Sequence, residues 1–153
     1  MDPAAVLDRV SRLAPSAEPR AGSDTPAVRV RLDHLTAVLQ NLRDDAETAF
    51  DMLFDHTAID WPERGCFELI YRLYSTRHGH ALVVTVEVPR SAPVAPTVCG
   101  LWPGAEWLER EAYDLFGICY DDHPDLRRVF LDDDWSGHPL RKDYEDPDML
   151  AAP

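Results

Sequence analysis

Four segments of this chain distribute their apolar residues as β-strands do. AVRVRL (27–32), CFELIYRLYST (66–76) and HALVVTVEVP (80–89) place an apolar residue at nearly every second position, which predicts strands with one buried face. FDMLFDHTAIDWP (50–62) has the aromatic and β-branched content of a strand, and Pro62 closes it. Because the short stretch RHGH (77–80) joins the segments 66–76 and 80–89, we predict that these two form a hairpin.

Three other segments have the apolar spacing of amphipathic helices. The first begins at the capping pair Asp2 and Pro3 and ends near Leu13. The second follows Asp33 as its N-cap, and the third runs from about Pro103 to a glycine C-cap at position 117. The residues predicted to face inward are Leu35, Val38, Leu39 and Leu42 in the second helix, and Leu108, Ala112 and Leu115 in the third.

The predicted order of elements is α-β-α-β-β-β-α. Consecutive strands joined by short turns favour an α+β fold, in which helices cover a mostly antiparallel sheet. From Asp121 onward the apolar residues show neither helical nor strand periodicity. We therefore predict a core domain over residues 1–120, followed by an extended C-terminal arm over residues 121–153.

The composition adds no structural element, but it excludes several classes of function. Of the 153 residues, 45% are apolar and 28% are charged, which is typical of a soluble globular domain. No run approaches the roughly 20 apolar residues that cross a bilayer, and the start MDPAAVLDRVSRL lacks a secretory signal pattern, so we expect a cytosolic protein. The formal net charge of -13 argues against nucleic acid as a ligand, because phosphate binding needs clustered Lys and Arg.

The number and spacing of the cysteines and histidines do not favour a metal site or a bound cofactor. Cys66, Cys99 and Cys119 are odd in number and far apart, which predicts no disulfide and no cysteine-ligated iron–sulfur cluster. Cys119 and His123 stand at i and i+4, with His138 and Cys99 further away, but a structural zinc site usually needs two close ligand pairs. We predict neither a metal nor a cofactor.

Two groups could in principle carry acid–base chemistry. Glu106, Arg110 and Asp114 follow one another at spacings of four, so we interpret them as ion pairs that stabilise an exposed helix face. His56 and Asp60 could face the same side of a strand, but no nucleophile stands at a signature position such as G-x-S-x-G. A core or rim histidine is the simpler interpretation, and we predict no catalytic residue.

The C-terminal arm is the segment with the clearest functional pattern. Aromatic and leucine residues, among them Phe130, Trp135 and Leu140, alternate there with arginines, as in the pair Arg127 and Arg128. Aromatic residues and arginine dominate the binding energy of protein interfaces. We therefore predict that the arm docks on a partner protein, and that the partner's surface orders it in place of the chain's own core.

Several motifs of the chain's latter two-thirds resemble the C subunit of the proton-pumping NADH-quinone oxidoreductase, respiratory complex I. They are LFDHTAID (53–60), EREAYDLFGI (109–118), HPDLRR (123–128), DDW (133–135) and GHPLRKDY (137–144). Phe130 and Asp132 depart from the residues more common in that family. Both departures lie in the arm, where they bear on the docking geometry.

This resemblance implies a role without redox groups. The C subunit belongs to the hydrophilic peripheral arm at the cytoplasmic face of the membrane, binds no flavin or cluster, and contacts the D subunit of complex I beside the quinone site. The implied role is structural support of electron transfer from NADH to quinone. We assign the partner contact to Glu109, Arg110, Glu111, Asp114, His123, Arg127, Arg128, Trp135, Gly137, His138, Pro139, Leu140, Arg141, Lys142, Asp143 and Tyr144.

Two other functions stay open at this point. One is the equivalent component of a membrane-bound nickel–iron hydrogenase or formate hydrogenlyase, complexes that resemble complex I. The other, from a different class, is a zinc-dependent hydrolase that would use Cys119, His123 and His138.

Overall fold

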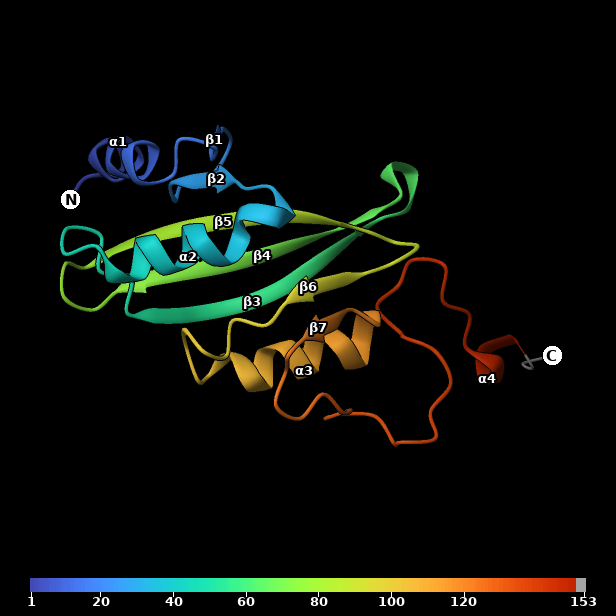
Figure 1. The fold of residues 1–153 in the computed structure, drawn as a ribbon. Helices are drawn as coiled ribbons and strands as arrows, with labels where there is room; N and C mark the ends of the chain where they lie inside the picture. The colour runs from blue at the N-terminus through green and yellow to red at the C-terminus, as the bar shows by residue number, and fades with distance from the viewer. Residues whose placement is uncertain (151–153) are drawn as a thin grey trace.

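A five-stranded sheet is the centre of the computed structural model, which describes residues 1–150; the predicted arm's last residues, 151–153, lie outside it. The strand order is β1-β2-β5-β4-β3 (Figure 1). Within this sheet β2 and β5 run parallel and the other neighbouring strands run antiparallel, so the predicted α+β fold with a mostly antiparallel sheet is confirmed. The strands are β1 Glu18–Arg20, β2 Ala27–Arg29, β3 Met52–Trp61, β4 Cys66–Ser75 and β5 His80–Pro89.

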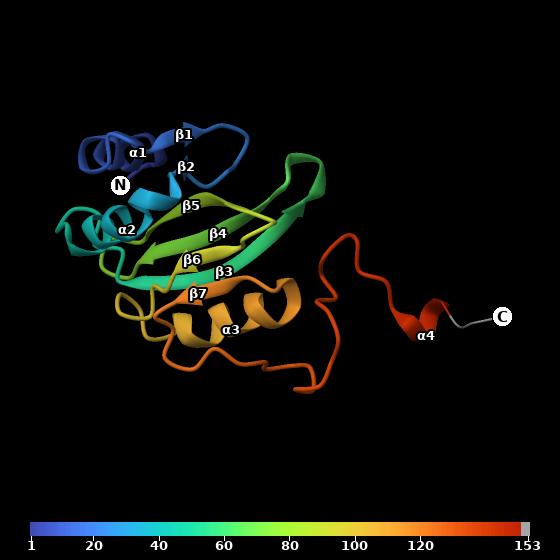
Figure 2. The ribbon, with the colours of Figure 1, turned by 45° about the vertical axis from the view of Figure 1, so that its right-hand side comes forward.

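Helices cover one side of this sheet. Both views place α2 and α3 on the same side, with α1 beside α2 (Figures 1 and 2). A second, two-stranded parallel sheet of β6 and β7 lies next to α3, and α3 itself packs directly on β3. The remaining elements are α1 Pro3–Leu13, α2 Leu35–Asp44, β6 Val94–Pro96, α3 Ala105–Phe116, β7 Cys119–Asp121, α4 Pro147–Leu150 and the 3-10 turns η1 Leu32–His34 and η2 Pro62–Arg64.

The period-two pattern of β4 and β5 produces the core as predicted. Phe67, Leu69 and Tyr71 on β4 are each 0% exposed, whereas Arg72 and Tyr74 point to the other side and are exposed. The buried residues of the sheet join those of α2 and α3 in one apolar cluster. Full burial of a side chain of this size contributes roughly 1.5–3 kcal/mol, so this cluster is the main stabilising feature of the fold.

The observed ends of the helices can be compared with the three predicted capping residues. Asp2 accepts a hydrogen bond from the amide of Ala5 at 2.9 Å, which confirms the first cap. The prediction for Asp33 is wrong: it lies inside η1 and binds Arg31, and His34 precedes α2 with no side-chain cap. Gly117 closes α3 in the left-handed conformation, with φ of 73°, as predicted.

Three short strands were not predicted. β1, β6 and β7 have three residues each, and β1 and β6 contain prolines, Pro19 and Pro96. A segment of three residues is too short to display a period, so only its pairing with other strands defines it. None of the helices within residues 1–150 is long and apolar enough to cross a membrane.

Candidate partner-docking surface

α3 carries three charged residues that point inward. Glu109 and Asp114 are 0% exposed and Arg110 is 3% exposed. The interpretation of Arg110 and Asp114 as members of exposed ion pairs along the helix is therefore wrong. The C-terminal arm covers this side of α3, and Arg110 and Asp114 bind the arm's backbone instead of one another.

Asp114 is the centre of the contact between α3 and the arm. Its Oδ2 atom accepts hydrogen bonds from three consecutive amides, those of Val129 (3.0 Å), Phe130 (2.7 Å) and Leu131 (3.1 Å). Its Oδ1 atom pairs with Arg128 at 2.8 Å. Burial alone would raise the pKa of this carboxyl, but Arg128 and the three amides lower it below the usual value. The carboxylate therefore stays ionised and holds the turn at 129–131.

Arg110 fixes the preceding residues of the arm. It donates hydrogen bonds to the carbonyl oxygens of Arg127 (3.1 Å) and Arg128 (3.2 Å). Its guanidinium also lies over the ring of Trp107, 4.8 Å from the centroid. These bonds go to backbone groups, so they define the path of the chain whatever the local side chains are.

The C-terminal end of α3 receives the next part of the arm. His138 donates from Nδ1 to the carbonyl oxygen of Asp114 at 2.9 Å, and Arg141 donates from Nε to that of Phe116 at 2.6 Å. Such bonds satisfy carbonyls that have no partner within a helix, and a cation there interacts favourably with the helix dipole. Gly117 permits the approach, because a Cβ atom at that position would lie 2.6 Å from His138 Cδ2.

The motif RKD (141–143) also binds the sheet. Asp60, at the end of β3, accepts a hydrogen bond from the amide of Lys142 at 2.9 Å and pairs with Arg90 at 2.7 Å. Arg90 bridges in turn to Asp143 at 2.9 Å. Burial alone would raise the pKa of Asp60, but the bonds from Arg90 and Lys142 lower it. Two motifs that lie far apart in the sequence, HTAID and RKDY, therefore meet at one carboxylate.

These contacts change the interpretation of the arm. Residues 122–146 contain no helix or strand, and α4 follows at Pro147. The expectation that only a partner's surface orders the arm is wrong, because charged residues of its own core hold it from Arg127 to Asp143. Periodicity could not reveal this, since the bonds link buried charges to irregular backbone.

The arm nevertheless leaves large apolar side chains in solvent. Phe130 is 66% exposed, Leu140 51% and Trp135 40%, and Trp107 on α3 is 60% exposed. We call these four residues the arm surface. Folding of the chain does not bury them, although it fixes the backbone at Phe130, whose amide binds Asp114, and at Leu140, whose amide binds the Leu115 carbonyl.

The residues assigned to partner contact fall into two groups. The side chains of Glu109, Arg110 and Asp114, and that of His123 at 1% exposure, are enclosed by this chain, so they can support a docking surface but not form it. Those that are at least partly exposed are Glu111, Arg127, Arg128, Trp135, Gly137, His138, Pro139, Leu140, Arg141, Lys142, Asp143 and Tyr144. Sequence reasoning missed Asp60 and Arg90 as anchors, although Asp60 lies in the HTAID motif.

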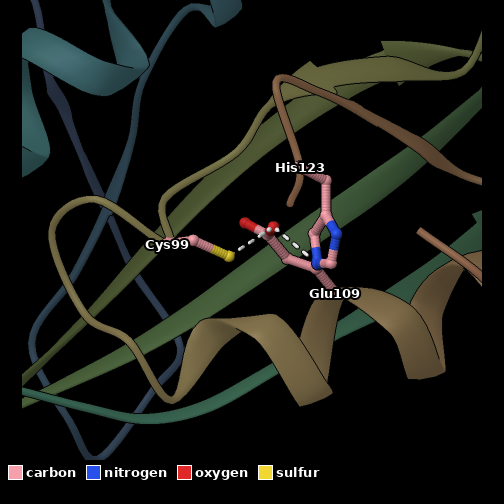
Figure 3. A group of neighbouring side chains, drawn as sticks. All are labelled: Cys99, Glu109 and His123. Carbon is pink, nitrogen blue, oxygen red and sulfur yellow. Dashed lines mark hydrogen bonds and ion pairs between the residues drawn. The ribbon is translucent and has the colours of Figure 1, made fainter. Parts of the chain in front are cut away.

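Cys99, Glu109 and His123 form a second buried cluster (Figure 3). Glu109 accepts hydrogen bonds from Thr97 (2.5 Å), from the amide of Val98 (2.7 Å) and from Cys99 (3.4 Å), and His123 Nε2 lies 3.7 Å away. Burial raises the pKa of Glu109, and it raises that of Cys99 to about 11. The cluster is therefore a network in which neutral donors surround one carboxyl group.

The histidine of this cluster is oriented for hydrogen bonding. Its Nδ1 atom accepts from the amide of Asp125 at 3.0 Å, which places the proton of the neutral ring on Nε2. Nε2 then donates to the carbonyl of Glu106 at 3.1 Å. A metal at Nε2 would need the opposite tautomer, so this donor set does not fit a zinc ion.

The other candidate sites do not assemble either. Within residues 1–150, no group of potential ligands brings Cys119, His123 and His138 together. His56 is a core residue, as expected: Nδ1 donates to the carbonyl of Ile70 at 3.0 Å, and Nε2 accepts from Tyr120 at 2.6 Å. Burial lowers the pKa of His56 to about 4. Asp60 serves the contact with the arm and does not orient this histidine.

This small α+β domain is similar to known proteins in sequence and in fold. Residues 28–148 match the family model for the respiratory-chain NADH dehydrogenase, 30 Kd subunit. The chain belongs to this family.

Among its relatives, the NADH-quinone oxidoreductase C subunit of Moorella thermoacetica is 41% identical over 90% of this chain and 92% of that protein. The C subunit of Bartonella quintana is 46% identical over 74% of this chain, which spans only 56% of that protein.

Solved structures show the same fold. A chain of the membrane-bound sulfane sulfur reductase, an archaeal respiratory membrane complex, superposes with a TM-score of 0.83 at 26% identity, covering 96% of this chain and 88% of that one. The trypsin-resistant fragment (1–134) of Nqo5 gives a TM-score of 0.69 at 31% identity, covering 82% of this chain and all of the fragment.

Proposed function

We propose that this chain is a non-redox structural subunit of the peripheral arm of NADH-quinone oxidoreductase, located at the cytoplasmic face of the membrane. In this role it contacts the D subunit, which helps to form the quinone site, and supports electron transfer from NADH to quinone, coupled to proton translocation. The chain supplies no catalytic residue and no cofactor of its own. Family membership supports the assignment of this chain to the complex. The exposed residues of the arm surface support the proposal that the arm contacts the D subunit.

The observation that carries the proposal is the combination of a fixed backbone with free apolar side chains. Asp114 and Arg110 hold residues 127–131, so Phe130 is presented without loss of backbone entropy on binding. A preorganised surface binds more tightly because less ordering opposes association. The exposed carboxylates of Asp132, Asp133 and Asp134 lie between Phe130 and Trp135 in the chain and favour a partner with basic groups around apolar pockets.

Co-expression with the D subunit tests this attachment. The double variant Phe130→Ala with Leu140→Ala removes exposed side chains only, so the free energy of unfolding of the isolated chain should change by less than about 0.5 kcal/mol for each change. We expect the amount of the D subunit that co-purifies to fall about tenfold or more, the loss that corresponds to about 1.4 kcal/mol of binding. Val94→Ala, an apolar residue 36% exposed on β6, is the control. Undiminished co-purification of the double variant would refute docking through the arm.

The second candidate is the equivalent component of a related complex, such as a membrane-bound hydrogenase or formate hydrogenlyase. The likeness to a chain of the sulfane sulfur reductase complex favours it, because that fold serves a complex of another kind. The 41% and 46% identity to proteins named as the C subunit favours NADH-quinone oxidoreductase. Co-purification with NADH-binding subunits would decide for the oxidoreductase, and co-purification with a nickel–iron subunit would decide for the hydrogenase.

A further inference from the structure

The face of the sheet turned away from α2 and α3 is apolar near the start of β3. Met52 is 43% exposed there, Phe54 58% and Tyr74 37%. The register shift between Leu53 and Asp55 adds Phe54 as an extra residue, so the strand bulges at this point. The solvent face of an antiparallel sheet normally carries polar residues. Three large apolar side chains in this position indicate a surface that is covered in the assembled protein.

These side chains surround a pocket of about 370 Å³. Its walls come from β3, β4 and β5 and include Met52, Phe54, Tyr74, Ala81 and Val83. The volume lies at the lower end of the roughly 300–1,000 Å³ that is common for binding pockets. A pocket of this kind accepts an apolar anchor, the feature around which most interface energy is concentrated.

One charged side chain, that of Arg72, lines this pocket. Its guanidinium lies over the ring of Phe54, 5.3 Å from the centroid. Within residues 1–150 it forms no ion pair, even with its cross-strand neighbour Asp55, although the chain carries 28 acidic residues against 15 basic ones. A stacked guanidinium with free N–H groups is suited to bind a carboxylate through two parallel hydrogen bonds.

We infer that Met52, Phe54, Arg72, Tyr74 and Val83 form a second docking site, which binds a segment of another subunit that carries an apolar side chain next to a carboxylate. The charge of Arg72 selects the carboxylate, and the pocket selects the apolar anchor. A protein segment fits better than a small amphiphile, because the exposed rim of Met52, Phe54 and Tyr74 extends beyond the pocket and needs a larger partner to cover it. The inference rests on the proposed function only in requiring a multi-subunit complex.

Photo-crosslinking in the assembled complex tests this site. The full chain carries p-benzoylphenylalanine in place of Tyr74, and mass spectrometry identifies the linked peptide. We expect one segment of another subunit in which an apolar residue neighbours Asp or Glu. Crosslinks only to lipid or detergent, only to a second copy of this chain, or to no protein at all would overturn the inference.

A charge reversal provides the second measurement. Arg72→Glu should reduce the yield of that crosslink about tenfold, a loss equivalent to one good charge-assisted contact, while Arg77→Glu, an exposed arginine of the adjacent hairpin turn, should leave it unchanged. Equal yields for the two variants would refute the role of Arg72. Failure of the arm's docking is distinguishable, because Phe130→Ala with Leu140→Ala would then leave assembly unaffected while the Tyr74 crosslink still depends on Arg72.

Discussion

β4 and the C-terminal arm both lie against the interior of this protein, but different groups attach them. On β4, Phe67, Leu69 and Tyr71 are fully buried. In the arm, Phe130 and Leu140 remain 66% and 51% exposed, and attachment comes from Arg128 and from backbone amides that bind α3. The strand contributes its side chains to the core, whereas the arm contributes mainly its backbone and its charges.

This difference has a functional consequence. Apolar burial is non-directional, and the side chains that it buries are no longer available to contact another protein. Charge-assisted hydrogen bonds to the backbone fix the direction of a segment and leave its apolar side chains unused. An arm attached in the second way can have a defined conformation and still present anchors to another protein.

The largest expected effect is on the core. Leu69→Ala removes a side chain that is 0% exposed and should lower the free energy of unfolding by about 2–5 kcal/mol, through lost burial and the resulting cavity. Leu140→Ala, the matched change in the arm, should lower it by less than about 0.5 kcal/mol. Urea denaturation of both variants measures the difference. Similar losses would mean that Leu140 packs into the core and would remove the contrast between the two regions.

Acid should weaken the core before it weakens the arm contact. The pKa of His56 falls from 6.5 to about 4 on burial, so the unfolded chain binds a proton that the folded chain excludes between these values. The contribution of the neutral His56 ring to stability is therefore complete above pH 6.5 and is lost as the pH falls toward 4, by on the order of 3 kcal/mol. Chemical denaturation across this range and NMR titration of the His56 ring measure the effect. A ring that titrates near 6.5 in the folded chain would contradict this account.

Breaking the central contact of the arm should have a smaller, local effect. Asp114→Asn removes the negative charge that binds Arg128 and three amides, at a cost of about 2–3 kcal/mol. Hydrogen exchange at the amides of residues 129–131 should accelerate accordingly. Asp125→Asn, an exposed partner of Arg127, is the control and should change nothing in these amides.

The Asp114 carboxylate also determines how far the pH can fall before the contact between α3 and the arm is lost. The pKa of Asp114 is lower in the folded chain than its usual 3.8, so its contribution is present above that pH and is lost as the pH falls through the folded value. Protection of amides 129–131 should therefore persist at about pH 5. Its loss already at that pH would show that other groups control the contact.

The smallest expected effect comes from the glycine at the end of α3. Gly117→Ala forces a side chain into the left-handed region and against His138, which should cost about 1–3 kcal/mol of local stability. We expect faster exchange at the Leu140 amide, which binds the Leu115 carbonyl. Gly100→Ala is the control, because a Cβ atom there meets nothing within 4 Å. Equal exchange in the two variants would mean that Gly117 is not required for the approach of the arm.

Parts of this protein were predictable from residues alone. The spacing of Leu35, Val38, Leu39 and Leu42 defined α2, and alternation defined β4 and β5, because one buried face imposes a period on the sequence. The motifs EREAYDLFGI and GHPLRKDY correctly indicated the family. Short strands such as β6 were not predicted, because a segment of three residues is too short to show an alternation of apolar and polar positions.

Hydrophobic spacing was enough to predict α2, β4 and β5 with their buried faces, and the motifs were enough to indicate the family. The roles of the charged residues, in contrast, depended on how the whole chain folds. Arg110 and Asp114 have the spacing of a surface ion pair, yet the arm covers them and Arg128 and backbone groups become their partners. Local spacing predicts which residues share a helix face, whereas the partner of a charge depends on chain segments that arrive from elsewhere, as Lys142 does at Asp60.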